Sequence, residues 1–279
     1  MSVWIDFVIS LSPFFIFTGL WAVVYFRGSK VNKKLLESFE NEIQDVLGTH
    51  VNEINKVKIR SDEYEFRCST KNKNIKVLTL HLKLVSRSFI IQWIINLFFK
   101  EQDRLFIGSK FGTNQGDENP VYRFDIVPYR KKSFISKRFD TFIAMDDIPT
   151  IKKSVDKKYM FKSESVAYVE HFVDNEEFIE LIDNMEPIME HLTIHKSQED
   201  TDPHLSITFE FYAVNEDDYS VSEMLQLFFL TAQLHISNHD TIKKKLAKGK
   251  KGKSMTARRG AARSVASRKK KSKKRSRKK

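Results

Sequence analysis

The sequence predicts an α+β protein: a single N-terminal transmembrane helix, a cytosolic mixed sheet-and-helix domain and a disordered basic C-terminal tail. Residues 7–26 carry no charge, which indicates the span. The next roughly 210 residues change between period-two and period-3.6 apolar patterns in blocks, not in strict βα alternation, which favours α+β. From Lys243 to the end there are 20 Lys and Arg and no acidic residue. We therefore expect an anchor over 1–27, a domain over 28–242 and a tail over 243–279.

The first element is the span. A helix rises about 1.5 Å per residue, so residues 7–26 cover roughly 30 Å, the thickness of the hydrocarbon core. A cleaved signal peptide is the weaker alternative, because no basic segment precedes the apolar run and no A-x-A-like site follows it. Pro13 is a candidate kink. The residues predicted to mark the span are Phe7, Leu11, Pro13, Phe17, Leu20, Trp21, Tyr25 and Phe26.

Flanking charges predict the orientation of the span. Asp6 is the only charged side chain before it, whereas Arg27, Lys30, Lys33 and Lys34 follow it at once. Because positive flanks stay on the cytosolic side, the N-terminus should be luminal and the C-terminal bulk cytosolic. The single cysteine, Cys68, makes no internal disulfide, as is usual in a reducing compartment.

The net charge of +12 belongs to the tail. Outside residues 243–279 the chain has 28 Lys and Arg against 36 Asp and Glu, so the rest is acidic. A segment with 20 cations and no acid cannot build a core and stays extended until a polyanion binds it.

A helix is predicted just after the span, and two strands follow it. Residues 30–47 carry an apolar face, and residues 63–69 and 74–86 have strand patterns, the second with leucines alternating at period two. The helical face consists of Val31, Leu35, Leu36, Phe39, Ile43, Val46 and Leu47.

The apolar segment 89–99 reaches only about 16 Å as a helix, too short to cross a bilayer. Two interpretations stay open: a buried helix of the core, or an interfacial or partner-binding helix. The candidate partner surface consists of Phe89, Trp93, Leu97 and Phe98.

The second half of the domain continues the mixed pattern. Residues 103–111 and 121–129 look like a strand pair joined by turn formers. Helices are predicted over 163–172 and 174–192, the latter with Asp174 as N-cap and its apolar face running on through Ile188, Met189 and Leu192. Strands are expected at 192–197 and 205–212, and a very apolar helix at 216–236 precedes the tail.

Catalytic patterns are missing from the sequence. It contains no G-x-G-x-x-G, no G-x-x-x-x-G-K-[ST] and no G-x-S-x-G. The pairs His191/His195 and His235/His239 have the i, i+4 spacing of zinc ligands, but no cysteine pair or H-E-x-x-H accompanies them. We therefore expect no catalytic residue, no metal site and no cofactor.

The tail's candidate ligands are ribosomal RNA, anionic lipid headgroups and a nuclear import receptor, and a merely solubilising tail is the alternative. The residues predicted to contact RNA are Lys243, Lys244, Lys245, Lys250, Lys251, Arg258, Arg259, Arg263, Arg268, Lys269, Lys270, Lys271, Lys273, Lys274, Arg275, Arg277, Lys278 and Lys279.

The order of these segments resembles a known family. VYFRGSKVNKKLLESFENEIQDVL after the span, VLTLHLKLVSRSFIIQWIINLFF, SVAYVEHFVDNEEFIELIDNMEPIMEHLTIHKSQ, and LSITFEFY with SEMLQLFFLTAQLHI before a basic end are similar to calumin, the coiled-coil-domain-containing protein forty-seven family. This likeness covers roughly residues 4 to 250.

The resemblance implies a PAT complex subunit of the endoplasmic reticulum without catalysis. It implies an Asterix-like membrane partner, the Sec translocon, the ribosome with its RNA, and nascent multi-pass membrane proteins as clients. Family members also carry an acidic luminal segment linked to calcium binding. Only about six residues precede the span here, and this departure from the family's pattern puts calcium binding in doubt. The alternative hypothesis is a nuclear-envelope membrane protein whose tail binds DNA or carries an import signal.

Overall fold

A computed structural model describes residues 2–99, 101–111, 123–131, 158–163, 165–196, 203–213 and 219–237. The chain forms two compact units, Met1–Ala232 and Gln233–Lys279. The second unit is described only over 233–237, the end of the last helix. The predicted tail, 243–279, lies outside the described residues.

The first helix, α1 (Ser2–Leu47), joins the predicted span and the predicted helix after it without interruption. It runs through Pro13 and through Gly28. The buried face of its C-terminal half includes Leu35, Phe39, Ile43 and Leu47, as the period of the apolar residues predicts.

Within the described residues, eight strands form one sheet in the order β1-β2-β3-β4-β8-β7-β5-β6, and each of their seven pairings is antiparallel. An antiparallel sheet with separate helices confirms the α+β prediction. The strands are β1 (Val51–Arg60), β2 (Glu63–Thr70), β3 (Ile75–Lys83), β4 (Asp103–Phe111), β5 (Phe124–Pro128), β6 (Tyr159–Ser163), β7 (Met189–Lys196) and β8 (Pro203–Phe211).

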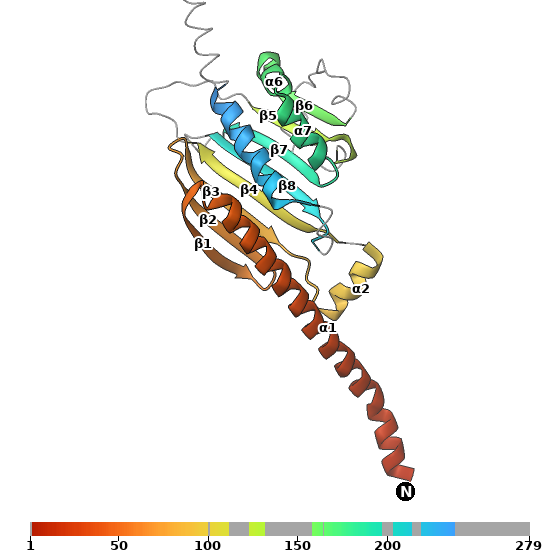
Figure 1. Cartoon of the computed structure of the whole chain (residues 1–279). Helices are drawn as coiled ribbons and strands as arrows, with labels where there is room; N and C mark the ends of the chain where they lie inside the picture. Colours follow the sequence, from red (N-terminus) through yellow and green to blue (C-terminus); the bar gives the residue numbers. More distant parts are fainter. Residues whose placement is uncertain are drawn as a thin grey trace, which may run out of the picture. The chain divides into compact units, whose positions relative to one another are not determined.

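Helices cover one face of this sheet (Figure 1). The C-terminal half of α1 lies over β1 to β3, residues 221–232 of the last helix (221–237) over β4 and β8, and α6 (Val166–Val173) and α7 (Glu176–Met185) near β5 to β7. Aromatic rings join the layers: Phe39 of α1 stacks on Phe211 of β8 with 5.6 Å between centroids, and Phe124 of β5 on Phe172 of α6 with 4.7 Å. The core therefore lies between sheet and helices.

The predicted strand pair 103–111 with 121–129 is wrong. β4 pairs with β3 and β8, and β5 pairs with β6 and β7. Turn formers between two strands predict a reversal of the chain, but they do not decide which strands become hydrogen-bonded neighbours. Strand β1, an edge strand, was not predicted, because it is rich in Asn and Lys, which are uncommon in strands, and only Val51 of it is buried.

The predicted helix 174–192 is too long. Helix α7 ends at Met185, and Met189 and Leu192 belong to β7. Pro187 has no amide N–H to continue the helical hydrogen bonds, so the helix stops there although Glu186 still has helical backbone angles. Its N-cap is Asn175, whose side chain accepts from the backbone N–H of Phe178 at 2.7 Å, not Asp174, which ends α6.

Candidate membrane-facing site

The N-terminal half of α1 exposes an apolar surface. Phe17 is 58% exposed and Phe26 71%, and Pro13, Leu20, Trp21 and Tyr25 are exposed as well, while Leu11 is half-buried. Phe7 lies within α1, but its side chain is outside the described set. Among the described helices, α1 alone is long and apolar enough to cross a membrane. This part of α1 therefore fits a transmembrane helix.

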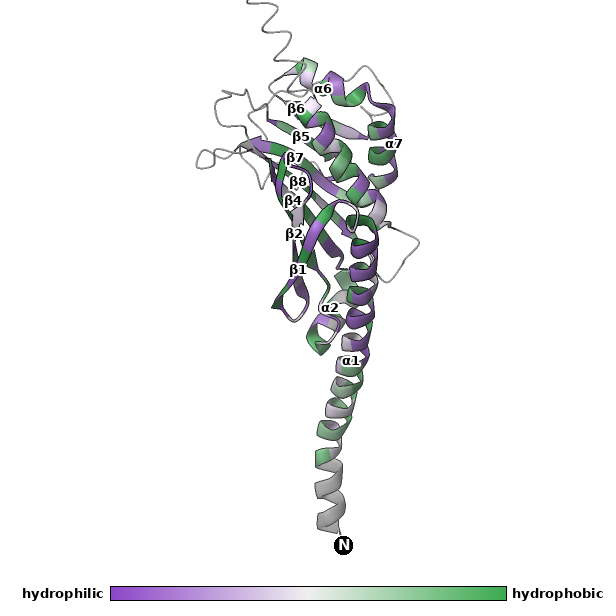
Figure 2. Ribbon diagram, turned by 60° about the vertical axis from the view of Figure 1, so that its left-hand side comes forward, coloured by the Kyte–Doolittle hydropathy of each residue, from purple (hydrophilic) through white to green (hydrophobic). Residues whose placement is uncertain are grey.

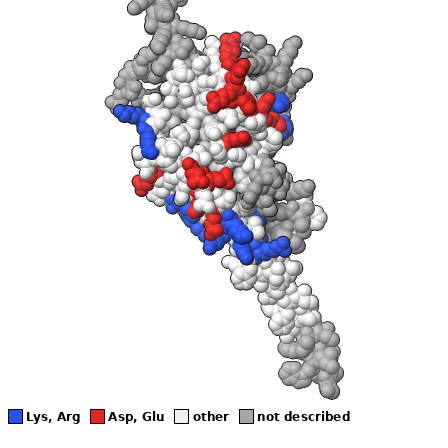
Figure 3. Space-filling view, in the orientation of Figure 1, with Lys and Arg blue, Asp and Glu red and all other residues white. Residues whose placement is uncertain are grey.

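A basic collar follows the apolar surface. Arg27, Lys30, Lys33 and Lys34 are all exposed on α1. Figure 3 shows blue side chains gathered where α1 leaves the domain and a described surface below them with neither blue nor red. The change from apolar to basic within two residues is typical of a membrane surface.

At the same level, α1 is tied to the connector between β3 and the next helix (residues 84–89). A Cβ atom on Gly28 would come within 2.1 Å of the carbonyl oxygen of Arg87, so only glycine allows this approach. One turn later, the Asn32 side-chain amide donates to the carbonyl oxygen of Val85 at 2.9 Å and to Asp62 Oδ1 at 3.0 Å. Helix and connector are thus joined by close packing and by hydrogen bonds.

A buried carboxylate holds the connector to the sheet. Asp103, at the start of β4, is fully buried and receives both guanidinium nitrogens of Arg87, at 2.9 and 2.6 Å. It also accepts the backbone N–H groups of Val85 at 2.8 Å and Ala213 at 2.9 Å. Arg87 Nη1 donates further to Asn32 Oδ1 at 2.9 Å. Four hydrogen bonds compensate the burial of the Asp103 charge, and the network links α1, the connector and the sheet.

Helix α2 (Ile90–Phe99) starts directly after this connector and turns apolar side chains outward. Ile91, Ile94, Phe98 and Phe99 are 72%, 45%, 77% and 76% exposed. Their spacing of three, four and one residues places them on one side of a helix, and we call them the outward stripe. Figure 2 shows α2 beside α1 at the end of the domain from which the apolar part of α1 extends. An amphipathic helix of a domain normally turns this face inward.

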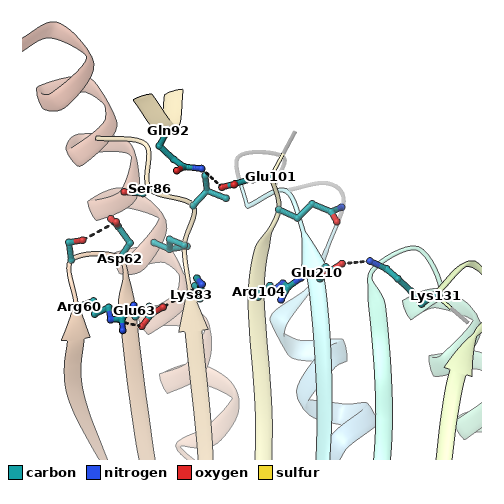
Figure 4. Close-up of a pocket in the computed structure, with 14 residues that line it drawn as sticks. Arg60, Asp62, Glu63, Lys83, Ser86, Gln92, Glu101, Arg104, Lys131 and Glu210 are labelled. Carbon is teal, nitrogen blue, oxygen red and sulfur yellow. Dashed lines mark hydrogen bonds and ion pairs between the residues drawn. The ribbon is translucent and has the colours of Figure 1, made fainter. Parts of the chain in front are cut away.

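Behind α2, a pocket of about 720 Å³ opens at the ends of the strands (Figure 4). Its wall includes Lys131 of the short 3-10 helix Tyr129–Lys131. Arg60 and Lys83 flank Glu63 at 3.7 and 3.6 Å. Arg104 and Lys131 both contact Glu210.

These charges compensate one another. Burial alone would raise the pKa of Glu210, but the hydrogen bond from Lys131 and the charge of Arg104 outweigh it and hold this pKa below its usual range. At the edge of the pocket, Gln92 of α2 donates to Glu101 at 2.5 Å. Each of the four cations thus lies beside a carboxylate.

Another polar cluster includes the residues of β7 that alternate with buried Leu192 and Ile194 and therefore lie on the other face of the sheet. His191 Nε2 is 3.1 Å from Asp125 Oδ1, and the rings of His195 and His204 stack at 5.8 Å. Burial opposes ionisation of Asp125, but the hydrogen bond from His191 outweighs it and lowers the Asp125 pKa. Burial, with the charge of His204 next, lowers the pKa of His195. No group of three His, Cys, Asp or Glu side chains within the described ranges is placed to hold a metal ion.

The family model for PAT complex subunit CCDC47 matches residues 12–279. The chain belongs to this family. A search of curated proteins found no match. The family is defined as a subunit of the PAT complex and supports a membrane-associated function, which agrees with the exposed apolar half of α1. It also confirms the family likeness drawn from segment order.

In this CCDC47 family member, the structure places part of the predicted partner surface. Phe89 is 54% exposed and Phe98 belongs to the outward stripe. Trp93 and Leu97 lie within α2, but their side chains are outside the described set. The other apolar helix, residues 221–237, is different: Leu225 and Phe228 are fully buried, so its first part belongs to the core.

The connector network was not predicted from the sequence. Its clearest signal is Asn32, an amide four residues before Leu36 and seven before Phe39 on the apolar face of α1. A polar residue in such a position needs a buried partner. The sequence does not indicate which distant side chains, here Arg87 and Asp103, complete the network.

Proposed function

We propose that this chain is a non-enzymatic membrane factor of the endoplasmic reticulum that helps multi-pass membrane proteins insert and fold at the ribosome-bound translocon. The observation that carries the proposal is the match of the PAT complex subunit family over residues 12–279. The exposed apolar half of α1 beside a compact α+β domain supports it, since it supplies an anchor and a folded unit next to the membrane.

The proposed topology is a single pass with a luminal N-terminus and a cytosolic domain. The basic collar of Arg27, Lys30, Lys33 and Lys34 supports this orientation, because positively charged flanks are retained on the cytosolic side. Within the membrane, we propose an Asterix-like subunit and the Sec translocon as partners, on the basis of the family likeness.

The proposed role of the tail is to contact ribosomal RNA. Residues 243–279 contain 20 Lys and Arg and no aromatic residue that could stack on bases. RNA binding should therefore depend on phosphates and show little sequence preference. If six to ten cations engage, affinity should fall by roughly a thousandfold or more between 50 and 200 mM salt.

Affinity purification from solubilised membranes tests the proposal. The full chain should bring down ribosomes and translocon subunits at low salt, and a preparation without both would contradict it. A matched variant, with every Lys and Arg of 243–279 replaced by Gln, keeps the length of the tail and removes its charge. Its ribosome co-sedimentation should drop at low salt, whereas membrane integration should persist. Equal co-sedimentation of both chains at every salt concentration would assign the ribosome contact to the domain.

The nuclear-envelope alternative depends on the run KKKSKKRSRKK, which also fits an import receptor or DNA. Imaging of a tagged chain separates the two proposals. A signal confined to the nuclear rim would favour the alternative, and a reticular signal the first.

A further inference from the structure

Helix α2 has the composition of a helix that contacts lipid. Its sequence, IIQWIINLFF, holds no charged residue, and the four described apolar side chains of the outward stripe point away from the domain. Contiguous exposed apolar surface on a protein marks a partner or a membrane. At ten residues, α2 is about 15 Å long and cannot cross the bilayer, so contact with lipid would be along the membrane surface.

The position of α2 follows from the connector. Gly28 lies two residues after Phe26, the last residue of the charge-free stretch, which places it about 3 Å beyond the end of that stretch along α1. Arg87 packs against Gly28, and α2 begins three residues later at Ile90. Three residues reach at most about 11 Å, so α2 starts at the depth of the lipid headgroups if α1 spans the membrane.

Ile90 and Gln92 lie at the two borders of the outward stripe and attach the start of α2 to the domain. Ile90 is buried against the domain, and Gln92 donates to Glu101 at the edge of the charged pocket. The helix is therefore held to the domain at both borders of the stripe, while the stripe itself stays exposed. The basic collar at the same depth suits the anionic surface of a cytosolic leaflet.

We propose that α2 is an interfacial helix, embedded in the cytosolic leaflet through the outward stripe, so that the domain contacts the membrane at a second place beside α1. The inference rests on the proposed span of α1. The connector network of Asn32, Arg87 and Asp103 fixes both helices to one sheet, so the domain is held against the bilayer instead of turning freely on its anchor.

Site-directed fluorescence in liposomes tests this. The full chain is reconstituted in phosphatidylcholine with phosphatidylserine, and an environment-sensitive fluorophore is attached at Phe98→Cys, at Phe17→Cys in the span, or at Val57→Cys on exposed strand β1. Native Cys68 does not interfere, because burial raises its thiol pKa to about 11. Lipids carry a nitroxide quencher either near the headgroup or near the end of the acyl chain.

The probe at position 98 should lose most of its fluorescence with the quencher near the headgroup (the shallow quencher). The probe at position 17 should lose most of it with the quencher near the end of the acyl chain (the deep quencher), and neither quencher should affect the probe at position 57. Quenching at Phe17 without quenching at Phe98 would overturn the interfacial helix and leave the anchor intact. A probe at Phe17 that no lipid quenches would instead contradict the proposed span.

A charge variant supplies a second test. Ile94→Glu with a probe at Ile91→Cys should abolish shallow quenching at Ile91, whereas Val57→Glu should leave that quenching unchanged. In native membranes, a photo-crosslinker at position 98 should capture lipid. Capture of a membrane protein instead would assign the outward stripe to a partner and overturn the lipid contact.

Discussion

Helices α2 and α7 are both ten residues long, but they turn their apolar sides in opposite directions. In α7, Phe178, Leu181, Ile182 and Met185 are buried, and acidic residues face outward from its first turn. In α2, the outward stripe is exposed and the helix carries no charge. Periodicity thus defines which residues share a side of a helix, whereas the packing around the helix decides what that side contacts.

The largest effect is expected at the base of α2. Arg87→Ala removes the counterion of the fully buried Asp103, and an uncompensated buried charge costs about 3–5 kcal/mol of unfolding free energy. Urea unfolding in detergent, followed by labelling of the single buried Cys68, measures it. Arg67→Ala is the control: Arg67 lies 2.6 Å from Glu65, as close as Arg87 to Asp103, but it is 61% exposed. It should cost far less, because water screens an exposed ion pair, and equal costs would show that the Arg87 network adds no more stability than a surface ion pair.

A matched pair of phenylalanines tests the comparison directly. Phe178→Ala in α7 leaves a cavity in the core and should cost roughly 3–4 kcal/mol, whereas Phe98→Ala in α2 should change stability in detergent by less than about 0.5 kcal/mol. The same urea titration measures both variants. A large loss for Phe98→Ala would mean that α2 packs on the domain in solution.

The N-cap of α7 should contribute less to the free energy of unfolding than the core contacts of this helix do. Asn175→Ala removes the acceptor for the Phe178 N–H and should cost about 1 kcal/mol. Ser165 is a suitable control, because it caps α6 without a side-chain hydrogen bond to the helix. Ser165→Ala should therefore have a smaller effect on the urea midpoint, and a reversed order would argue against this capping role.

The smallest effect concerns pH on the strand that follows α7. Burial lowers the pKa of His195 below its unfolded value, so the unfolded chain binds a proton first. The contribution of neutral His195 to the free energy of unfolding is present above the unfolded pKa, about 6.5. It is lost as the pH falls through that value toward the folded pKa. A pH series of urea midpoints should show this loss for the native chain, and His195→Gln should flatten it. An unchanged slope in the variant would assign the pH dependence to other groups.

Much of the fold was predictable from local patterns. The leucines of β3 alternate at period two and are buried, and the C-terminal half of α1 buries the face that its spacing defines. Strand pairing was not predictable in this way: β4 and β8 are hydrogen-bonded neighbours although about 90 residues separate them in sequence. Strand β1 was not predicted, because it is rich in Asn and Lys and only Val51 of it is buried.

The candidate site also has some features that could be predicted from the sequence and others that could not. The charge-free stretch 7–26, the basic collar and the apolar character of 89–99 are properties of single segments, so they could be predicted without a structure. That segment 89–99 is too short to cross a bilayer could be predicted in the same way. Whether α2 lies inside the core or outside depended on residues far from it. Only the tertiary structure brings Gly28, Asn32, Arg87 and Asp103 together, because close packing and a shared buried charge join segments whose separation along the chain carries no local signal.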